Sequence, residues 1–409
     1  IKYWEVGNEN YGPWQAGHIV NGDTINGTKY GDIFNVFVDS MKAADPSIKI
    51  GAVLFPHDGV YNDWSKDVLQ KVQNTADFLI IHDYFRRKPN PNNVTYQEML
   101  NSISEVQQNV SNVNNMVTSY TNKPSGYFPI AMTEFNSKTG EREISMANAI
   151  FISQVLCEQI KNNIGMSLLW SFQNGLDSHG GDHGMTARNS TVVQNNTPRP
   201  VYYVYYYLNK FLGDNLVFSY SNDPDINCYI STFSSGEIGM IVINTSQSNK
   251  TIEFNATSSF TKDNFYWYEM NATDETDKKI YVNDLTSVNL EGGPDINNVP
   301  AFYRPVNSNY KFNIKPYSVN FIANSNDLTS VKNFNDLEIK VYPNPFDESI
   351  SFIPNIQFDN IIIYDVNGKK VLETSGNIIN TKSLKKGIYI LKLYKSNHSS
   401  QVKVIKIKK

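Results

Sequence analysis

Up to about residue 212, short apolar runs that are typical of β-strands alternate with longer segments that have helical spacing. The strand-like runs lie at residues 2–7, 48–54, 78–84, 128–135 and 166–172. The helix-like segments lie at residues 30–44, 64–74, 96–120, 145–162 and 201–212. This alternation predicts a parallel sheet with the helices packed outside it, which is an α/β fold.

Five strands are too few for a closed barrel, which needs eight. They fit the second half of a (β/α)8 TIM barrel, from the fourth strand to the eighth. The chain starts on a strand with Ile1 and not with Met, so we expect that an upstream segment has been lost, and that a signal peptide could have been lost with it. A half-barrel has exposed sheet edges and an uncovered apolar face, so we expect the isolated chain to aggregate or fail to fold.

The pattern changes after residue 212, and we predict four segments in all. Residues 1–212 form the half-barrel, and the short alternating runs of residues 213–324 predict an all-β sandwich. The polar stretch 325–336 is typical of a linker. Residues 337–409 form a third, small unit of short strands with a basic end.

Composition excludes several classes of protein. The 409 residues are 40% hydrophobic, enough for a large core, and the net charge of −4 gives no basic surface for nucleic acid. No apolar run reaches the length that a transmembrane helix needs. Cys157 and Cys228, the only cysteines, fall in different predicted domains, so we expect no disulfide framework, no metal site and no cofactor.

Two glutamates stand where a predicted strand gives way to a loop. Glu9 follows the first strand in the run Trp-Glu-Val-Gly-Asn-Glu at residues 4–9, and Glu134 ends the fourth in Met-Thr-Glu-Phe-Asn at residues 132–136. In a (β/α) barrel this end of the strands is the catalytic face. Two carboxylates there, one acid and one nucleophile, are what the hydrolysis of a glycosidic bond requires.

The run Tyr-Trp-Glu-Val-Gly-Asn-Glu at residues 3–9 resembles the fourth-strand motif of family 51 α-L-arabinofuranosidases, which belong to the clan A retaining glycoside hydrolases. The resemblance implies that Glu9 is the general acid/base and that Glu134, on the seventh strand, is the nucleophile. Residues 213–324 are similar to the C-terminal β-domain of these enzymes, with residues 314–319 as its closing strand. The resemblance to family 51 implies that this chain is an N-terminally truncated enzyme.

The tail carries a second, independent resemblance. Residues 341–346, 363–369 and 386–392, followed by a Lys-rich end, are similar to the C-terminal sorting domain of the type IX secretion system of Bacteroidetes. This implies export across the outer membrane, with the secretion machinery as a partner and the protein secreted or held at the cell surface. The nine Lys between residues 382 and 409 are then better explained as part of a sorting signal than as a surface that binds nucleic acid.

Four further residues are candidates for substrate binding. The resemblance implies that Asn8 hydrogen-bonds a sugar hydroxyl, although a loop-capping Asn is the alternative. His82 and Tyr84 share one face of their strand, where a Tyr could hold the nucleophile ionised; a core His is nearly as plausible. Trp170 resembles a sugar-stacking platform, and ordinary barrel core is the alternative.

The chemistry sets further expectations. We expect the pKa of Glu9 to be raised by the neighbouring Glu134, and the two carboxyls to lie about 5–5.5 Å apart if the mechanism is retaining. Glu5 should project inward beneath Glu9 and needs a buried partner, which could be an Arg of the missing strands.

One loop offers a rival metal site. Residues 174–189 contain His179, Asp182, His183 and Arg188. Scattered His and Asp in a Gly-rich loop are weak evidence for a metal, and we favour a loop that contacts substrate.

These observations predict a retaining, exo-acting glycosidase, most similar to an α-L-arabinofuranosidase, with plant arabinoxylan or arabinan as its polysaccharide or oligosaccharide substrate. Two alternatives stay open. Another clan A specificity, such as a β-xylosidase or an endo-glucanase, uses the same two carboxylates. A non-catalytic surface carbohydrate-binding protein would keep the fold without turnover.

Overall fold

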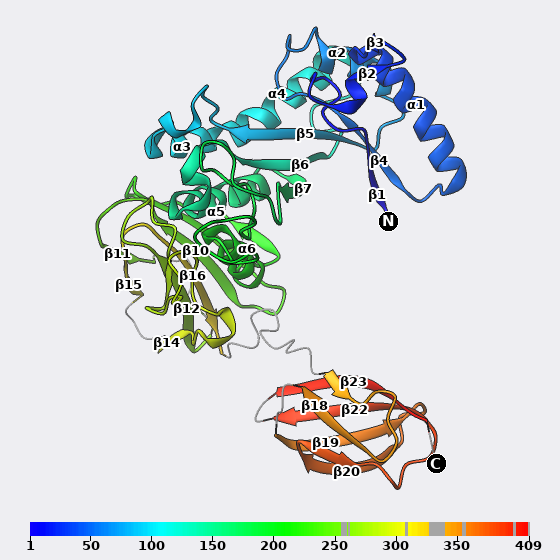
Figure 1. Cartoon of the computed structure of the whole chain (residues 1–409), viewed down its shortest axis with the longest axis vertical. Coiled ribbons are helices and arrows are strands. Elements are labelled where there is room, and N and C mark those ends of the chain that lie inside the picture. The colour runs from blue at the N-terminus through cyan, green and yellow to red at the C-terminus, as the bar shows by residue number, and fades with distance from the viewer. Residues whose placement is uncertain are drawn as a thin grey trace. The chain divides into compact units, whose positions relative to one another are not determined.

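The computed structural model describes residues 1–254, 260, 262–306, 310–326, 340–353, 357–395 and 398–407. The chain divides into two compact units, Ile1–Lys332 and Asn333–Lys409 (Figure 1). We describe each unit by itself.

The first unit begins with a curled parallel sheet of five strands (Figure 1). In sheet order the strands are β1 (Tyr3–Val6), β4 (Lys49–Val53), β5 (Phe78–Phe85), β6 (Ile130–Ser137) and β7 (Ile164–Leu169). Every neighbouring pair is parallel, and the strands follow one another across the sheet in chain order. This half-barrel is consistent with the predicted partial (β/α) barrel. A short hairpin, β2 (Ile19–Val20) and β3 (Asp23–Thr24), follows β1.

Helices connect the parallel strands, and one further helix follows the last of them. They are α1 (Gly27–Ala44), α2 (Trp64–Val72), α3 (Tyr96–Asn101), α4 (Glu105–Tyr120), α5 (Met146–Lys161) and α6 (Pro200–Phe211). Short 3-10 turns lie at Ala16–His18, Pro91–Asn93, Ser102–Ser104, Gly140–Ile144 and Ile296–Asn298. Local signals fix several of the starts: Thr95 and Glu98 form a capping box before α3, and Pro200 opens α6.

The helical segment predicted over residues 96–120 is helical throughout, but it is not one regular α-helix. The segment breaks into α3, a 3-10 turn and α4. At the break the Ser102 hydroxyl donates to the Met99 carbonyl and the Ser104 hydroxyl to the Asn101 carbonyl. Such local bonds compete with the regular helical pattern.

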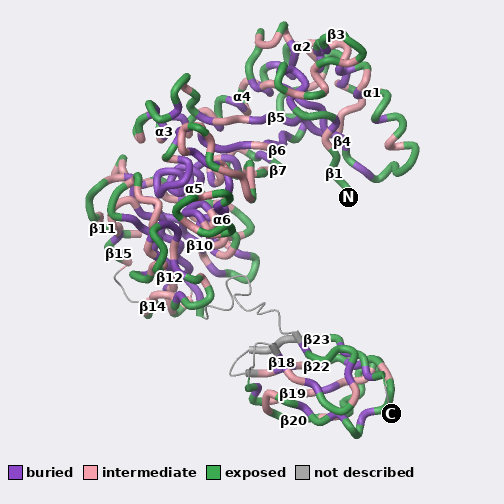
Figure 2. The backbone as a smooth tube through the Cα atoms, viewed as in Figure 1, coloured by how far each residue is buried: buried purple, intermediate pink, exposed green. Residues whose placement is uncertain are grey.

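The half-barrel core lies between the sheet and the helices, and Figure 2 shows buried backbone along β5, β6 and α5. Fully buried side chains of the strands include Ile50, Leu79, Ile81 and Met132, and those of the helices include Phe34, Val68, Val113 and Phe151. The edge strands differ. Tyr3 and Trp4 on β1 and Leu168 on β7 are among the exposed large apolar residues, so both edges present apolar surface.

An all-β part follows within the same unit. Its main sheet has the order β13-β12-β16-β10-β9-β8, with β14 also paired to β12, and β11 pairs with β15 in a second, two-stranded sheet. The strands are β8 (Asn215–Val217), β9 (Ile226–Thr232), β10 (Ile238–Asn244), β11 (Lys250–Glu253), β12 (Asn264–Asn271), β13 (Tyr281–Val282), β14 (Phe302–Pro305), β15 (Lys311–Ile314) and β16 (Ser318–Ser325).

Both faces of the main sheet are covered. On one face Tyr207 and Phe211 of α6 pack against Tyr268 of β12 and Phe321 of β16, with ring centroids 4.7–6.3 Å apart. On the other face, Phe265 of β12 packs edge-on against Phe312 of β15. The half-barrel and the β-domain therefore share apolar packing, and we keep their boundary at residue 212 as a prediction.

A buried ion pair network adds a polar tie between the two parts. Arg199, just before α6, contacts Asp182 Oδ2 at 2.9 Å and Glu291 Oε2 at 3.3 Å. The side chains of Arg199 and Asp182 are 3% and 0% exposed. Asp182 lies in the loop after β7 and Glu291 in the β-domain, so one guanidinium holds both.

The second unit is a small β-sandwich of two sheets, of order β17-β18-β21 and β20-β19-β22-β23. The strands are β17 (Lys340–Tyr342), β18 (Ser349–Ile353), β19 (Phe358–Asp365), β20 (Lys370–Gly376), β21 (Ile378–Asn380), β22 (Gly387–Lys395) and β23 (His398–Lys406). Phe346, Ile361 and Leu391 lie in its core. Within the predicted linker 325–336, residues 327–336 lie outside the described residues.

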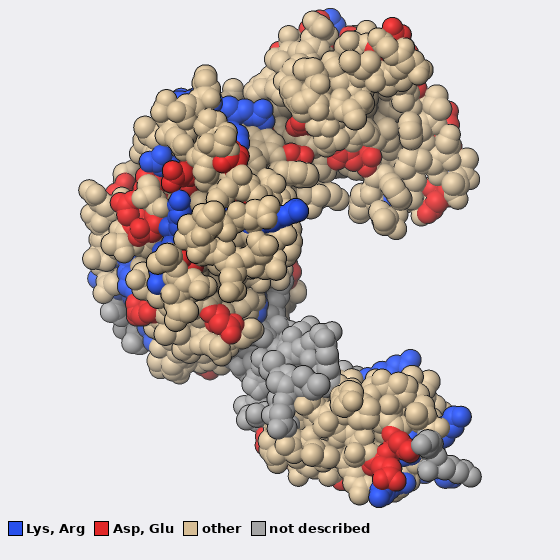
Figure 3. Space-filling model, viewed as in Figure 1, with Lys and Arg blue, Asp and Glu red and all other residues tan. Residues whose placement is uncertain are grey.

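The surface carries charges of both signs. Figure 3 shows Lys and Arg interspersed with Asp and Glu over the visible face. Among the described residues, no helix combines the length and the apolar character that crossing a bilayer demands.

The Arg199 network generates a prediction on stability. Arg199→Met leaves two buried carboxylates without their cation, which should lower the free energy of unfolding by about 3–5 kcal/mol. Urea denaturation followed by circular dichroism measures the loss. Arg188→Met, which removes an exposed arginine of the same loop, is the matched control. Equal midpoints for the two variants would contradict the assignment.

Candidate active site

The loop after β1 is a tight turn that aims Glu9. Gly7 has a φ of +88°, and a Cβ there would lie 2.1 Å from Asn10 Oδ1. Asn10 Oδ1 accepts a hydrogen bond from the Asn8 backbone N–H at 3.0 Å, and its Nδ2 donates to the Gly17 carbonyl at 3.2 Å. Glu9 itself has a positive φ of 41°, a conformation that non-glycine residues adopt only when their surroundings enforce it.

A register shift between β5 and β6 places Glu134. Ile81 pairs with Met132, but the next residue, His82, pairs with Glu134, so Thr133 is an extra residue in β6. Regular alternation would turn Glu134 toward the same face as Met132, which is buried in the half-barrel core. The bulge turns Glu134 toward His82 instead.

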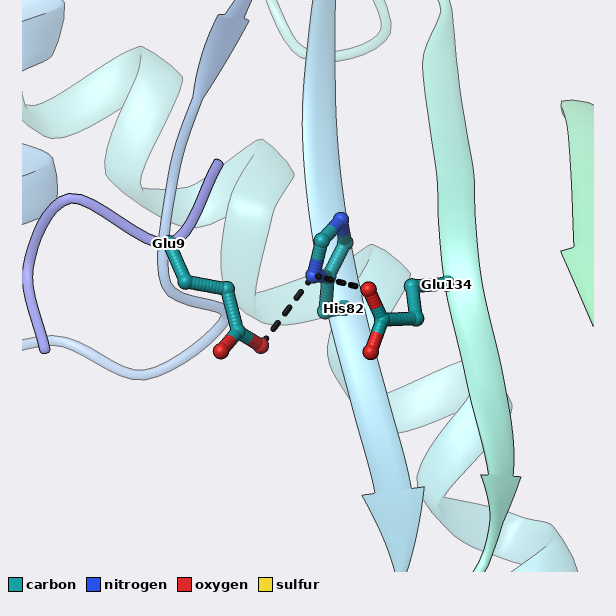
Figure 4. Close-up of side chains that lie close together, drawn as sticks. All are labelled: Glu9, His82 and Glu134. Carbon is teal, nitrogen blue, oxygen red and sulfur yellow. Dashed lines mark hydrogen bonds and ion pairs between the residues drawn. The ribbon is translucent and has the colours of Figure 1, made fainter. Parts of the chain in front are cut away.

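Glu9, His82 and Glu134 converge, with the His82 ring between the two carboxylates (Figure 4). Glu9 follows β1, whereas His82 and Glu134 lie inside β5 and β6, so the expectation that Glu134 ends its strand is wrong: β6 continues to Ser137. His82 Nδ1 lies 3.1 Å from Glu9 Oε1 and 3.6 Å from Glu134 Oε2. One ligand-type atom from each of the three residues lies within 4.8 Å of the others. The other ring nitrogen, Nε2, lies 3.0 Å from Thr133 Oγ1.

Each carboxylate has a further donor. The Tyr84 hydroxyl donates to Glu134 Oε1, and the Trp14 indole N–H donates to Glu9 Oε2 at 2.6 Å. Burial, followed by the bond to Glu134, raises the pKa of Tyr84, so the hydroxyl stays a donor. Sequence reasoning missed Trp14 and Thr133; its one available signal for Trp14 was an aromatic residue shortly after the first motif.

The pKa of Glu9 shifts in the direction opposite to the one expected. Burial raises the pKa of Glu9, but hydrogen bonds from His82 and Trp14 outweigh it, and the pKa is lowered. The expected raised pKa is therefore wrong for this state of the protein. Burial lowers the pKa of His82, but its bond to Glu9 and the charges of Glu5, Glu134 and Glu9 outweigh it, and that pKa is raised.

Glu5 lies in the same cluster. Its Oε1 is 3.7 Å from His82 Nε2 and has no hydrogen-bond partner within the described part of the chain. Burial raises its pKa. Among the described residues, His82 is the ion-pair partner of Glu5. The arginine expected from upstream strands stays a prediction.

The two remaining candidates lie at the rim. The Asn8 residue is exposed, and its backbone bonds within the loop. Trp170, which follows β7, is 48% exposed, and its carbonyl accepts a hydrogen bond from Asn136 Nδ2 at 2.7 Å. Neither side chain contacts Glu9 or Glu134 in the contacts that the structure describes, and their roles stay predictions.

The loop 174–189 does not gather its His and Asp residues around one point. Asp182 pairs with Arg199, and His183 contacts Glu143. Among the described residues, the one grouping with metal-ligand geometry is Glu9, His82 and Glu134. There His82 Nδ1 is shared with two carboxylates and its pKa is raised, so a proton competes with any cation for that nitrogen.

The chain is similar to known glycoside hydrolases. Over 92 residues the chain is 33% identical to intracellular exo-α-(1→5)-L-arabinofuranosidase 1 of Bacillus subtilis (strain 168), a match that covers 22% of this chain and 17% of the relative. The fold is similar to that of the GH51 α-L-arabinofuranosidase of Thermotoga petrophila RKU-1, with a TM-score of 0.58 and 19% identity over 79% of this chain and 66% of that one. A family 44 xyloglucanase of Paenibacillus polymyxa gives a TM-score of 0.56 and 14% identity over 79% and 66%.

These similarities confirm the resemblance to glycoside hydrolases and to family 51 arabinofuranosidases in particular. The chain spans just under two thirds of the length of the similar structures, and the aligned segment spans about a sixth of the curated relative. Residues 340–408 match the model of the Secretion system C-terminal sorting domain. This domain marks proteins exported by the type IX secretion system, which confirms the predicted export.

A pH-dependent contribution to stability follows from Asp83, which accepts a hydrogen bond from Asn109 Nδ2 at 2.6 Å. Burial raises its pKa from 3.8 to about 6. Because the folded state holds this proton more tightly than the unfolded state, the contribution of Asp83 to stability is fully present below pH 3.8 and is lost as the pH rises through about 6. Asp83→Asn should remove this loss and stabilise the protein at pH 7 by about 1–3 kcal/mol.

Urea melts between pH 4 and pH 8 measure the effect. The matched control is Asp39→Asn, an exposed carboxylate on α1, which should leave the profile unchanged. A parallel pH profile for Asp83→Asn and the parent would refute the prediction.

Proposed function

We propose that this chain carries strands four to eight of a (β/α)8 catalytic barrel and works in a retaining α-L-arabinofuranosidase that releases arabinose from plant arabinoxylan or arabinan. Residues 1–212 are the barrel half, 213–324 the β-domain, 325–336 the linker and 337–409 the sorting domain. The observation that carries the proposal is the pair of carboxylates, Glu9 and Glu134, held on either side of His82.

The separation of the two carboxylates supports retention. Inverting enzymes place their carboxyls about 6.5–9.5 Å apart to admit a water molecule, whereas retaining enzymes place them about 5–5.5 Å apart. A distance of at most 4.8 Å between the ligand-type oxygens of Glu9 and Glu134 supports the second class. Glu134 is then the nucleophile, and the Tyr84 hydroxyl donates a hydrogen bond to its Oε1.

The reaction takes two steps. In the first, a Glu134 oxygen forms a bond to the anomeric carbon while Glu9 gives its proton to the departing glycosidic oxygen. In the second, the Glu9 carboxylate takes a proton from water, and the water oxygen displaces Glu134 from the anomeric carbon. The products are the free sugar and the regenerated carboxylate of Glu134.

The proton for the first step is shared within the His82 and Glu9 pair. The pKa of His82 is raised and the pKa of Glu9 is lowered, so within this pair both shifts favour the proton on the imidazole. Transfer across the 3.1 Å contact between His82 Nδ1 and Glu9 Oε1 makes Glu9 the acid. Once Glu134 is bonded to the sugar, one negative charge is gone from the site, which makes the proton easier to release.

Specificity is the less constrained part of the proposal. The sequence similarity to an exo-arabinofuranosidase favours arabinose, with Asn8 bonding a sugar hydroxyl and Trp170 stacking on a ring. The fold similarity to a family 44 xyloglucanase keeps an endo-acting glucanase, or a β-xylosidase, as the second candidate. Substrate choice depends on the loops around the carboxylates.

The test is an assay of the full gene product on nitrophenyl α-L-arabinofuranoside, β-xyloside and β-glucoside and on arabinoxylan, with the anomer of the first product read by NMR. We expect arabinose with retained configuration. Glu134→Ala should lower kcat by at least roughly a thousandfold. Glu253→Ala, an exposed glutamate of the β-domain, is the control. Release of another sugar would replace the first choice, and binding without release would favour a carbohydrate-binding protein.

The alkaline limb of the pH profile of kcat/KM tests whether His82 and Glu9 share the proton. Activity that needs this proton falls as the pH rises through the raised pKa of His82. In His82→Asn the proton rests on a carboxyl alone, so the alkaline limb of kcat/KM should move to lower pH. His57→Asn, an exposed histidine outside the cluster, should leave the limb in place. A chelator should not change the rate, because the proposed steps use no metal.

A further inference from the structure

Glu143 is a buried carboxylate that the proposed mechanism does not use. It lies in the 3-10 turn Gly140–Ile144 after β6, with its side chain 1% exposed. Its Oε1 accepts hydrogen bonds from the backbone N–H groups of Thr139 at 3.0 Å and Gly140 at 3.2 Å. Its Oε2 faces His183 Nε2 at 3.3 Å, within ion-pair distance although the angle is not that of a hydrogen bond. Because these contacts hold the buried carboxylate of Glu143 in place, it can fix the position of the His183 ring.

His183 is fixed through its backbone as well as its ring. Its carbonyl accepts hydrogen bonds from the Ser171 N–H at 2.8 Å and from Asn136 Nδ2 at 3.2 Å. The preceding residue, Asp182, is pinned by Arg199. The loop after β7 therefore holds this imidazole against the end of β6, only two residues beyond the proposed nucleophile.

The ring of His183 packs on the ring of Tyr84, with centroids 5.1 Å apart and planes tilted by 40°. Tyr84 in turn donates its hydroxyl hydrogen to Glu134. A phenol can orient a carboxylate only if its ring is held, because rotation about its side-chain bonds swings the hydroxyl away. Glu143, His183, Tyr84 and Glu134 thus form a continuous series of contacts.

We propose that His183, anchored by Glu143, is a positioning residue that fixes Tyr84 and through it the nucleophile Glu134. The proposal rests on the proposed function and adds a residue of the 174–189 loop to it. His183 acts through Tyr84 and does not itself touch the reacting atoms. The loop 174–189, which the sequence suggested as a metal or substrate site, then has a different function, which is to hold the side chain of Tyr84 in place.

A readout that does not require activity decides whether His183 holds the ring. The full gene product is made with 3-fluorotyrosine at position 84, and its 19F spectrum is recorded for the parent and for His183→Gln. Gln keeps an amide that can meet Glu143 but removes the aromatic ring. We expect one narrow line in the parent and a shifted, broadened or split line in His183→Gln. Identical spectra would overturn the proposal.

Kinetics test the consequence by a double-mutant cycle. His183→Gln should lower kcat by on the order of ten- to a hundredfold with KM little changed, since it misplaces a catalytic group without removing substrate contacts. In the Tyr84→Phe background, where no hydroxyl is left to orient, the same change should cost less than about twofold. Equal losses in both backgrounds would show a merely structural role and overturn the proposal.

His179→Gln is the matched control, because His179 lies in the same loop and bonds through its backbone to Asp177 and Asn92. It should change neither the 19F line nor kcat. If the parent hydrolyses no glycoside, the proposed function fails, while the 19F comparison still decides whether His183 positions Tyr84.

Discussion

The arrangement of the site depends on one imidazole among three carboxylates. Glu5, Glu9 and Glu134 all lie within 3.7 Å of a His82 ring nitrogen, and each would repel the others in a partly buried space. His82 offers a donor to both sides and carries a raised pKa, so it neutralises part of that repulsion. Two strained or irregular backbone features serve this contact: the positive φ of Glu9 and the extra residue Thr133 in β6.

Hydrophobic periodicity was enough to predict the five parallel strands, because each is a short apolar run flanked by polar turns. Strand β5, predicted at residues 78–84, spans Phe78–Phe85. Periodicity correctly indicated helix at residues 96–120 but not the 3-10 turn inside it, where two serine hydroxyls bond to backbone carbonyls. The competition between side-chain and backbone hydrogen bonds leaves little trace in a hydrophobic pattern.

The catalytic candidates could be found because neighbouring parallel strands of one sheet bring them together: Glu9 follows β1, and His82, Tyr84 and Glu134 lie in the second halves of β5 and β6. What the sequence could not show is the state of their protons. The lowered pKa of Glu9 depends on donors from His82, 73 positions away, and from Trp14, whose loop folds back over it. Such contacts are tertiary, and strand parity alone would even have turned Glu134 away from His82.

The β-domain supports the site although it contributes no reacting group. Helix α5 follows β6, the strand that carries the proposed nucleophile, and β-domain carbonyls accept hydrogen bonds from its first N–H groups: Met146 donates to Asp277 at 2.9 Å and Ala147 to Glu275 at 2.7 Å. A helix N-terminus needs such acceptors, so the β-domain completes this helix. Arg199 does the same for the loop that carries His183. Because both elements that flank β6 are fixed from the β-domain, the geometry around Glu134 is a property of the whole first unit rather than of the half-barrel alone.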